Sequence, residues 1–371
     1  MTQILGVGIV GYGAIARVHA AVIQLFAQLY PHVEIVPAIV AIAPGGANSQ
    51  ARALRDFPLV PQVAYETLLQ RPDVDIVLCA TPTELHFDHV MEALQAGKHV
   101  MCEKPLTVNI AQSQLLVATA TTHSRVLALN HHFRHVPAIA EMQRQIASGA
   151  LGAPISAHLR YFRASNVNPQ RALTWRFVGH GGGVLVDLGS HLIDLTNFLF
   201  ESQIVRVQAE LRTVISERPN QSGALVAVES DDVAWVTAQL ANGMRVSIEA
   251  SKMVPGAADD VRVEAYGTRA SYFFDMLDVN LLGIGDARMG TSMHRTQLWN
   301  KMTPAASLPS PETSTGSLSW HAASWQQCLA RIAGCETPMC DGSAGLLVDA
   351  VIAAAQQSAT AGGTWVEVAY E

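Results

Sequence analysis

The sequence predicts an α/β protein in which a doubly wound parallel sheet is followed by an α+β domain with a mostly antiparallel sheet. In the first third of the chain, apolar β-branched runs alternate with helical patterns. From residue 154, alternating strands joined by hairpin turns dominate. The chain has 371 residues, more than a typical single domain, and we place two domains at 1–131 and 132–371.

The first predicted elements are a strand, a glycine turn and a helix. The apolar run ILGVGIV leads into GYGAIA, and a helical pattern then runs from Ala14 to Leu29. Gly11, Gly13 and Ala16 fit the G-x-G-x-x-G/A pattern in the strand-to-helix context that it requires. Such a turn lets the backbone approach a pyrophosphate, and the helix N-terminus offers N–H groups to it. Glycines often only make turns, but this context favours a dinucleotide-binding Rossmann domain.

The same alternation continues to residue 131. Strands are predicted in VEIVPAIVAI, DIVLCATP, KHVMCEKP and SRVLALNHH, with helices at about 84–96 and 110–122. Because ligands of parallel sheets bind beyond the carboxyl ends of the strands, Thr81-Pro82 and Glu103-Lys104-Pro105 are predicted to lie at the site. From its position alone, a solvated surface lysine is the favoured interpretation of Lys104.

The second domain is predicted to be built differently. A helix at about 138–148 is followed by an alternating strand in PISAHLRYFR, and by strands in IVRVQAELRTV, DDVAWVTAQLANGMRVSIEAS and VRVEAYGTRASYFF. Helices near 320–332 and 343–360 are predicted to be packing elements. The stretch from about 285 to 319 is rich in Ser, Thr, Pro and Met, and we expect it to be irregular.

The segment VDLGSHLIDL combines an apolar helical pattern with three titratable residues. On an α-helix, Asp187 and His191 are four apart and Asp194 follows by three, so one face could carry all three side chains. A carboxylate beside a histidine sets its tautomer and raises its pKa, which suits proton transfer near neutral pH. The alternative is structural: Asp187 could cap a helix after GGG, and His191 could be a hydrogen-bonded core residue.

Composition excludes several classes of function. The hydrophobic fraction is 49%, the charged fraction 15% and the net charge −7, and no basic block suggests a nucleic-acid partner. No apolar run is long enough for a membrane span, and the N-terminus lacks the pattern of a secretory signal. The five cysteines form no C-x-x-C pair and no His cluster completes a zinc-like set. We therefore expect a cytoplasmic protein with reduced thiols and no metal site.

Four motifs together resemble the Gfo/Idh/MocA oxidoreductase family, which includes glucose–fructose oxidoreductase and inositol dehydrogenase. They are GIVGYGAIA, ATPTELH, AGKHVMCEKPL and GGGVLVDLGSHLIDL, in this order, and the resemblance covers nearly the whole chain. It implies that Lys104 hydrogen-bonds the reacting substrate oxygen and that His191 is the acid/base. It also implies that Asp187 orients His191 or binds a substrate hydroxyl, while Asp194 caps or braces the helix. A homodimer or homotetramer is implied by the resemblance too.

These arguments predict three groups of site residues. The catalytic residues are Lys104, Asp187 and His191. The cofactor-binding residues are Gly11, Gly13, Ala14, Ile15, Ala43, Ser49, Arg52, Thr81, Pro82, His86, Glu103 and Lys104. The substrate-binding residues are Lys104, Asn130, His132, Arg163, Trp175, Arg176, Asp187 and His191, with His131, Asn166 and His180 as further polar candidates.

Some of these assignments carry alternatives. His132 stands where the family's Asn-x-Arg-Phe region frequently has Arg. Trp175 and Arg176 could offer an apolar platform and a donor fork to a sugar or polyol. Taken individually, each polar candidate is better explained by a structural role than by substrate binding.

The end of the second predicted strand bears on the choice of cofactor. An NAD-specific Rossmann domain usually has an acid there to bind the ribose 2′-OH, but Ala43 and Pro44 occupy that place. The missing acid permits a 2′-phosphate, to which Ser49 and Arg52 could donate. The sequence thus favours NADP over NAD, unless Ser49 and Arg52 only begin and decorate a helix.

The leading functional prediction is an NAD(P)-dependent oxidoreductase that transfers hydride between nicotinamide and a secondary alcohol or ketone. Its substrate class is a sugar, polyol or related hydroxy compound. One alternative is an NAD-dependent glycoside hydrolase, which predicts redox-neutral turnover. Another is a non-catalytic dinucleotide-binding sensor, which would not need Lys104, Asp187 and His191 together.

Overall fold

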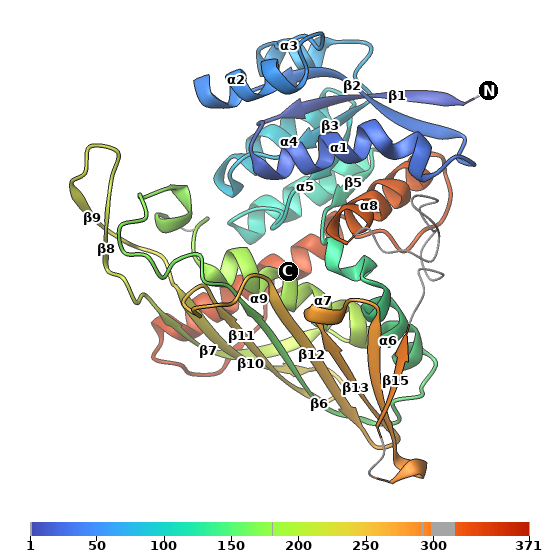
Figure 1. Cartoon of the computed structure of the whole chain (residues 1–371), viewed down its shortest axis with the longest axis vertical. Helices are drawn as coiled ribbons and strands as arrows, with labels where there is room; N and C mark the ends of the chain where they lie inside the picture. Colours follow the sequence, from blue (N-terminus) through green and yellow to red (C-terminus); the bar gives the residue numbers. More distant parts are fainter. Residues whose placement is uncertain (1, 180, 291–292, 298–315, 371) are drawn as a thin grey trace. The chain divides into compact units, whose positions relative to one another are not determined.

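The computed structural model describes residues 2–179, 181–290, 293–297 and 316–370 (Figure 1). Contacts group the described parts of residues 1–135 and 299–346 into a first compact unit, and those of 136–298 and 347–371 into a second. The linear division at residue 131 stays a prediction. The linear division places helix α8 (Ser317–Ile332) in the second domain, whereas the contacts place this helix in the first unit.

The first unit contains a parallel five-stranded sheet with the order β2-β1-β3-β4-β5. Its strands are β1 (Gln3–Val10), β2 (Ile35–Ala43), β3 (Ile76–Cys79), β4 (His99–Cys102) and β5 (Leu127–Leu129). The central strands β3 and β4 are apolar on both faces, as expected of a sheet covered on both sides by helices. The predicted doubly wound parallel sheet is confirmed.

Helices pack on both faces of this sheet. They are α1 (Ala14–Leu29), α2 (Ala47–Asp56), α3 (Tyr65–Gln70), α4 (His86–Gln95), α5 (Ile110–Thr122) and α8. One apolar core joins α1 and α8 to side chains such as Ile9 and Leu78. A second core joins α4 and α5 to the side chains that follow these two in the same strands, Val10 and Cys79. The alternation of strand side chains thus divides the core into two layers.

The second unit contains a nine-stranded sheet with the order β15-β14-β13-β12-β6-β11-β10-β7-β16. Its strands are β6 (Pro154–Phe162), β7 (Ile204–Arg212), β10 (Val233–Leu240), β11 (Arg245–Ser251), β12 (Asp260–Gly267), β13 (Ala270–Asp275), β14 (Leu281–Asp286), β15 (Met293–Gln297) and β16 (Val366–Glu367). All neighbours are antiparallel except β6 and β11. The predicted, mostly antiparallel sheet is confirmed. A separate hairpin pairs β8 (Glu217–Pro219) with β9 (Leu225–Ala227).

One expectation about this unit is wrong. Residues 293–297 lie in the stretch predicted to be irregular, yet they form β15, which pairs with β14. Backbone pairing supplied by a neighbouring strand can impose a strand on a sequence that has no alternating pattern. Residues 298–315 of the same stretch lie outside the described residues.

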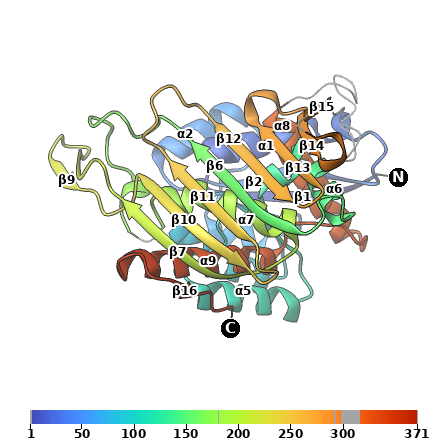
Figure 2. The same cartoon turned by 90° about the horizontal axis from the view of Figure 1, so that it is seen from below.

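Helices α6 (Pro137–Ala147) and α7 (Ser190–Phe200) pack against the strands of this sheet, and Figure 2 shows the strands from one face. Strand β10 illustrates the alternation, since Ala234 and Val236 are buried while Trp235 between them is exposed. Helix α9 (Gly342–Thr360) begins in the first unit and continues into the second. Among the described residues, no helix combines the length and apolar character needed to cross a membrane.

Candidate functional site

The glycine turn of the first unit has the geometry of a phosphate cradle. Gly11 has φ +77°, its N–H donates to Ala43 O at 2.9 Å, and a Cβ there would lie 2.9 Å from Ala80 O. A Cβ on Gly13 would meet nothing within 4 Å, so the backbone there faces open space. Helix α1 has no side-chain cap and no acidic residue in its first turn. These features fit the approach of an anionic pyrophosphate to the N–H groups that precede and open α1.

The other residues predicted at this turn lie beside it. Ala14 and Ile15 begin α1, and Ala43 ends β2. On α2, Ser49 Oγ accepts a hydrogen bond from Tyr12 N at 3.1 Å, and Arg52 Nε donates to Tyr12 O at 3.4 Å. Ser49 and Arg52 therefore contact the backbone of the glycine turn, in addition to being residues of helix α2.

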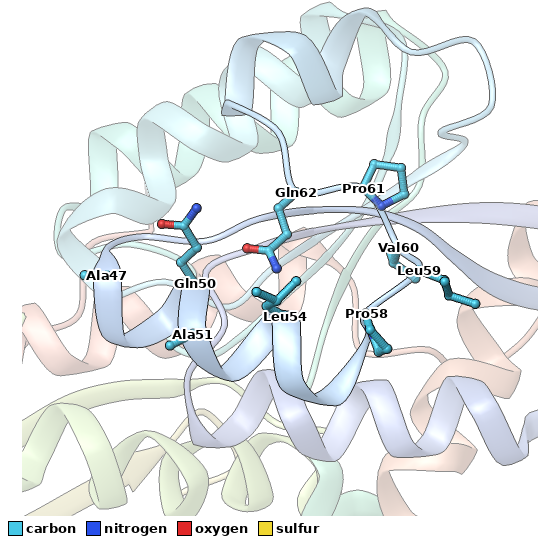
Figure 3. A pocket seen from close by; sticks show the side chains of 9 residues that line it. All are labelled: Ala47, Gln50, Ala51, Leu54, Pro58, Leu59, Val60, Pro61 and Gln62. Atoms are coloured by element: carbon cyan, nitrogen blue, oxygen red, sulfur yellow. The ribbon is translucent and has the colours of Figure 1, made fainter.

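The opposite face of α2 lines an open cavity of about 590 Å³ (Figure 3). Its lining consists of Ala47, Gln50, Ala51, Leu54 and residues 58–62. Residues 47, 50 or 51, and 54 share one helix face, whereas Ser49 and Arg52 lie on the face toward Tyr12. None of the predicted cofactor residues lines this cavity, so we do not assign the dinucleotide to it.

Two turns at the carboxyl edge of the parallel sheet are tied together by a histidine. Thr81 follows β3, and Lys104 follows β4. His86 is buried, with Nδ1 2.9 Å from Pro105 O and Nε2 3.0 Å from Thr81 O. The ATPT turn, which contains Thr81 and Pro82, is thus joined to the EKP turn. A contact of His86 with the cofactor stays a prediction.

Glu103 lies in a buried polar cluster that the sequence did not reveal. Its Oε1 is 2.8 Å from His19 Nε2 and accepts a hydrogen bond from Asn130 Nδ2 at 2.6 Å. Asn130 Nδ2 also lies 2.8 Å from His321 Nδ1 of α8. Burial alone would raise the pKa of Glu103, but His19, His321 and Asn130 lower it well below its usual range. Glu103 and Asn130 are therefore interior residues of the first unit.

His132 lies next to this cluster. Its ring stacks on His321, with centroids 4.3 Å apart and planes at 22°. Burial is the largest cause that lowers the pKa of His132 well below its usual range, and the nearby charge of Lys104 acts in the same direction. Burial also lowers the pKa of His321 to about 3. Both rings are therefore neutral at physiological pH.

Two groups in the described residues have donor atoms spaced as metal ligands are. His19, Glu103 and His321 form one, and the ligand atoms of the other, formed by Cys79, His86 and Cys102, also lie within 4.8 Å of one another. In the first group, each donor atom already has a protein partner within hydrogen-bond distance. In the second, the ring nitrogens of His86 face carbonyl oxygens and Cys102 Sγ donates to Glu103 O. Sequence spacing could not reveal either group, because its members come from separate elements.

In the second unit, the segment that carries Asp187 begins with a π-helical turn (Leu185–Gly189) before α7. The regular α-helical spacing expected for this segment is therefore wrong in its first turn. Asp231 accepts hydrogen bonds from Val184 N and Leu185 N at 2.9 and 2.8 Å, so the cap is Asp231. A Cβ on Gly183 would lie 2.2 Å from Asp231 Oδ1, which explains why glycine precedes this turn.

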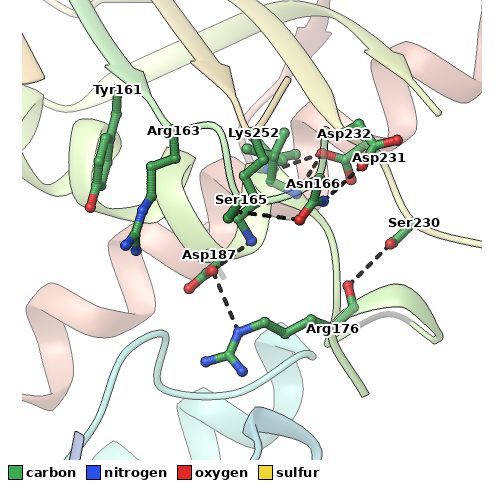
Figure 4. A network of polar contacts seen from close by, with 12 residues as sticks. Tyr161, Arg163, Ser165, Asn166, Arg176, Asp187, Ser230, Asp231, Asp232 and Lys252 are labelled. Atoms are coloured by element: carbon green, nitrogen blue, oxygen red, sulfur yellow. Dashed lines mark hydrogen bonds and ion pairs between the residues drawn. The ribbon is translucent and has the colours of Figure 1, made fainter. Parts of the chain in front are cut away.

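Asp187 pairs with two cations (Figure 4). Lys252 Nζ donates to Asp187 Oδ2 at 2.6 Å, and Arg176 Nε lies 3.7 Å from the same oxygen. Lys252 is 5% exposed in its side chain, whereas Asp187 is 25% and Arg176 43% exposed. Asp187 is thus held from the interior by lysine and faces a more exposed guanidinium.

His191 is buried in the first turn of α7, and its ring centroid lies 6.1 Å from that of Tyr161. Tyr161 Oη donates to Asp259 Oδ1 at 2.6 Å. Asp194 is buried within the same helix. The catalytic role of His191 and the bracing role of Asp194 stay predictions.

The remaining predicted substrate residues of this unit have protein partners. Arg163 Nε donates to Ala258 O at 3.1 Å. Asn166 Nδ2 donates to Asp232 Oδ1 at 2.8 Å, which makes Asn166 part of the buried framework. Arg176 lies over the ring of Trp175 at 4.3 Å, so the expected platform and fork form a cation–π pair. His180 lies outside the described residues.

Comparison with known proteins identifies both parts of the chain. Residues 5–131 match the model described as an oxidoreductase family with an NAD-binding Rossmann fold, and residues 139–273 match the Gfo/Idh/MocA C-terminal domain. A levoglucosan dehydrogenase of Pseudarthrobacter phenanthrenivorans is 29% identical over 289 residues, which are 74% of each chain. A dTDP-3,4-didehydro-2,6-dideoxy-alpha-D-glucose 3-reductase of Streptomyces violaceoruber is 30% identical over 65% of this chain and 68% of its own.

A solved structure agrees with these matches over the full length. A levoglucosan dehydrogenase in complex with NADH superposes with a TM-score of 0.91 at 26% identity and covers 99% of this chain and 100% of its own. With the glycine turn, the EKP turn and the two family models in agreement, the chain belongs to the Gfo/Idh/MocA family of oxidoreductases and carries its NAD-binding Rossmann domain.

Proposed function

We propose that this oxidoreductase interconverts a secondary alcohol and a ketone of a sugar, polyol or related hydroxy compound. The observation that carries the proposal lies within the first unit. Lys104 follows β4 at the edge of the parallel sheet where the glycine turn opens, with its N–H groups at the start of α1. Ligands of such sheets bind at this edge, so a lysine there has access to a substrate held against the cofactor.

A bound nicotinamide dinucleotide would supply the hydride acceptor or donor. The residues at the glycine turn would bind its pyrophosphate, since Gly13 leaves the backbone open and α1 carries no competing cap. Cationic Lys104 would hydrogen-bond the reacting substrate oxygen and stabilise the negative charge that develops on it.

His191 is the proposed acid/base of the second unit. It would take the hydroxyl proton during oxidation of the alcohol and return it during reduction of the ketone. Asp187 is proposed to bind a substrate hydroxyl or to orient His191. Its ion pair with Lys252 supports a fixed, ionised carboxylate, which is a good acceptor for a hydroxyl of a sugar or polyol.

For the cofactor, we keep the preference for NADP as a proposal. It is supported by Ala43 in the place of an acid, and by Arg52, whose Nε contacts Tyr12 O while its terminal nitrogens bond no described residue. The complex of the levoglucosan dehydrogenase with NADH supports NAD instead. A titration with both dinucleotides decides between them.

We also propose that the chain forms a homodimer or homotetramer. Support comes from the sheet of the second unit, where Trp235 and Ile155 are exposed apolar side chains. Light scattering on the purified protein measures the molecular mass, and a monomer at micromolar concentration would contradict the proposal.

The test of the proposed reaction is a panel of sugars, anhydrosugars and polyols, followed by nicotinamide absorbance with each dinucleotide. A substrate-dependent absorbance change supports the proposal. Cleavage of a glycoside without net absorbance change would favour the glycoside hydrolase, and dinucleotide binding without turnover on the whole panel would favour the sensor.

A further inference from the structure

We propose that Trp325, His19 and Glu103 form a hydrogen-bonded relay that positions Lys104, and that α8 supplies its first member. The inference rests on the proposed role of Lys104. It concerns the first unit alone, and its members come from α8, α1 and the turn after β4.

The relay begins with a group that can only donate a hydrogen bond. An indole N–H can donate but cannot accept, and Trp325 Nε1 lies 2.8 Å from His19 Nδ1. His19 Nδ1 must therefore be the bare nitrogen of the ring. The proton of His19 is then on Nε2, which lies 2.8 Å from Glu103 Oε1 and donates to it. Trp325 thus selects the tautomer of His19 that stabilises the Glu103 carboxylate.

The same assignment accounts for Asn130. Its Nδ2 lies 3.3 Å from His19 Nε2, but two N–H groups cannot bond each other. The two amide hydrogens therefore go to Glu103 Oε1 and to His321 Nδ1, at 2.6 and 2.8 Å. His321 must accept, in agreement with the lowered pKa that keeps its ring neutral. The indole N–H of Trp325, the Nε2–H of His19 and both amide hydrogens of Asn130 then each have a definite acceptor.

The relay ends at the backbone of the proposed catalytic lysine. Glu103 Oε2 accepts a hydrogen bond from Lys104 N at 3.4 Å, while Oε1 is held by His19 and Asn130. With both oxygens engaged in the interior, the Glu103 side chain is fixed, and the turn that starts at Lys104 is fixed with it. Since His19 lies on α1, the relay also links that turn to the helix of the glycine motif.

These contacts give α8 a role beyond packing. Its Trp325 is fully buried in the core with α1, and His321 lies one turn earlier on the same helix. The sequence of the first 131 residues contains the glycine turn and the EKP turn, but it lacks the donor that sets the tautomer of His19. The placement of Lys104 is therefore completed by a helix from near the end of the chain.

The test compares two substitutions on α8 in the full chain. Trp325→Phe deletes the indole N–H and keeps an aromatic ring in the core. Trp320→Phe is the matched control, because its Nε1 is buried and donates to none of the described residues. We expect Trp325→Phe to lower kcat about tenfold, the size of one lost hydrogen bond, with KM and the dinucleotide Kd within twofold. Trp320→Phe should leave all three within twofold.

Nitrogen NMR of the ring nitrogens in 15N-histidine-labelled protein gives a readout that a merely structural role would not move. The wild-type protein should show His19 as the Nε2–H tautomer, assigned by its loss in His19→Gln. Trp325→Phe should add the Nδ1–H tautomer. An Nδ1–H tautomer of His19 in the wild-type protein overturns the relay. The relay is also overturned if Trp325→Phe loses the tautomer preference while kcat stays unchanged.

Failure of the relay and failure of the proposed function are distinguishable. If Lys104→Met turns over normally, the role of Lys104 is wrong, whatever the tautomer of His19. If Lys104→Met is inactive while Trp325→Phe is fully active, the lysine is needed but the relay does not position it.

Discussion

Lys252 Nζ lies 2.6 Å from Asp187 Oδ2, and only 5% of the lysine side chain is exposed. The second cation near this oxygen, Arg176, is farther away at 3.7 Å. A buried ammonium is stable only beside a negative charge. The pair therefore ties Asp187 to Lys252, the buried residue that directly follows β11.

Deleting this lysine should lower the stability of the fold. Lys252→Met keeps much of the stem but leaves Asp187 without its close partner, and we expect the free energy of unfolding to fall by about 2 kcal/mol. Denaturant unfolding measures it. Since removing both charges leaves no unpaired group, Lys252→Met combined with Asp187→Asn should lose less than the sum of the single changes. Additive losses would show that the two side chains do not interact in solution.

His191→Ala should lower turnover by about a hundredfold or more, because the proton transfer loses its acid/base. Dinucleotide binding, measured by nicotinamide fluorescence, should stay near normal. His123→Ala is the control, since His123 is exposed at the end of α5. Turnover that is unchanged at every pH would remove His191 from the mechanism.

Lys104→Met retains the stem and deletes the charge that would stabilise the developing oxyanion. We expect kcat to fall by about a hundredfold or more. Lys98→Met is the matched control, because Lys98 precedes β4 and its ammonium bonds the carbonyl oxygen of Arg71. If only KM rises, Lys104 binds the substrate without stabilising the transition state.

The cofactor proposal predicts a loss of preference in one variant. Arg52→Ala should weaken NADP binding by about tenfold and change NAD binding little, since a guanidinium contact to the 2′-phosphate would be lost. Arg55→Ala on the same helix is the control, because Arg55 pairs with Asp56. Tighter binding of NAD than of NADP by the wild-type protein would contradict the proposal.

The neutral state of His321 predicts a loss of stability in acid. Its pKa is lowered to about 3, chiefly by burial, while the unfolded chain has the ordinary value near 6.5. Between these values the unfolded state binds the extra proton, so stability falls as the pH falls. The slope contributed by one such group is at most about 1.4 kcal/mol per pH unit.

Protonation of Glu103 also lowers the stability of the fold as the pH falls, but it does so at a lower pH than protonation of His321. The folded pKa of Glu103 is lowered, so its contribution is present above the unfolded value and is lost as the pH falls. Urea unfolding from pH 7 to pH 5 lies above most of the Glu103 titration and reports on the buried histidines, His321 and His132. His321→Gln should show a shallower decline than the wild-type protein, and an equal decline would show that His321 takes up its proton in the folded state.

The sequence by itself determined the local pieces of this protein. The strand–glycine–helix unit around Gly11 and Gly13 was predicted, because its period and its turn chemistry are local properties. Helices 14–29 and 110–122 were predicted with the bounds that the structure shows. The EKP turn was placed at the carboxyl edge of the sheet by strand order alone.

Only the tertiary structure decided which side chains meet. Lys252 follows the alternating strand β11, and nothing in its sequence neighbours marks it as the partner of Asp187, 65 residues away. The helix that carries Trp325 was predicted to be a packing element, yet Trp325 meets His19 across 306 residues of sequence. Asp231 caps the turn that carries Asp187 from another element. Such contacts have no sequence period, because burial of distant elements against one another creates them.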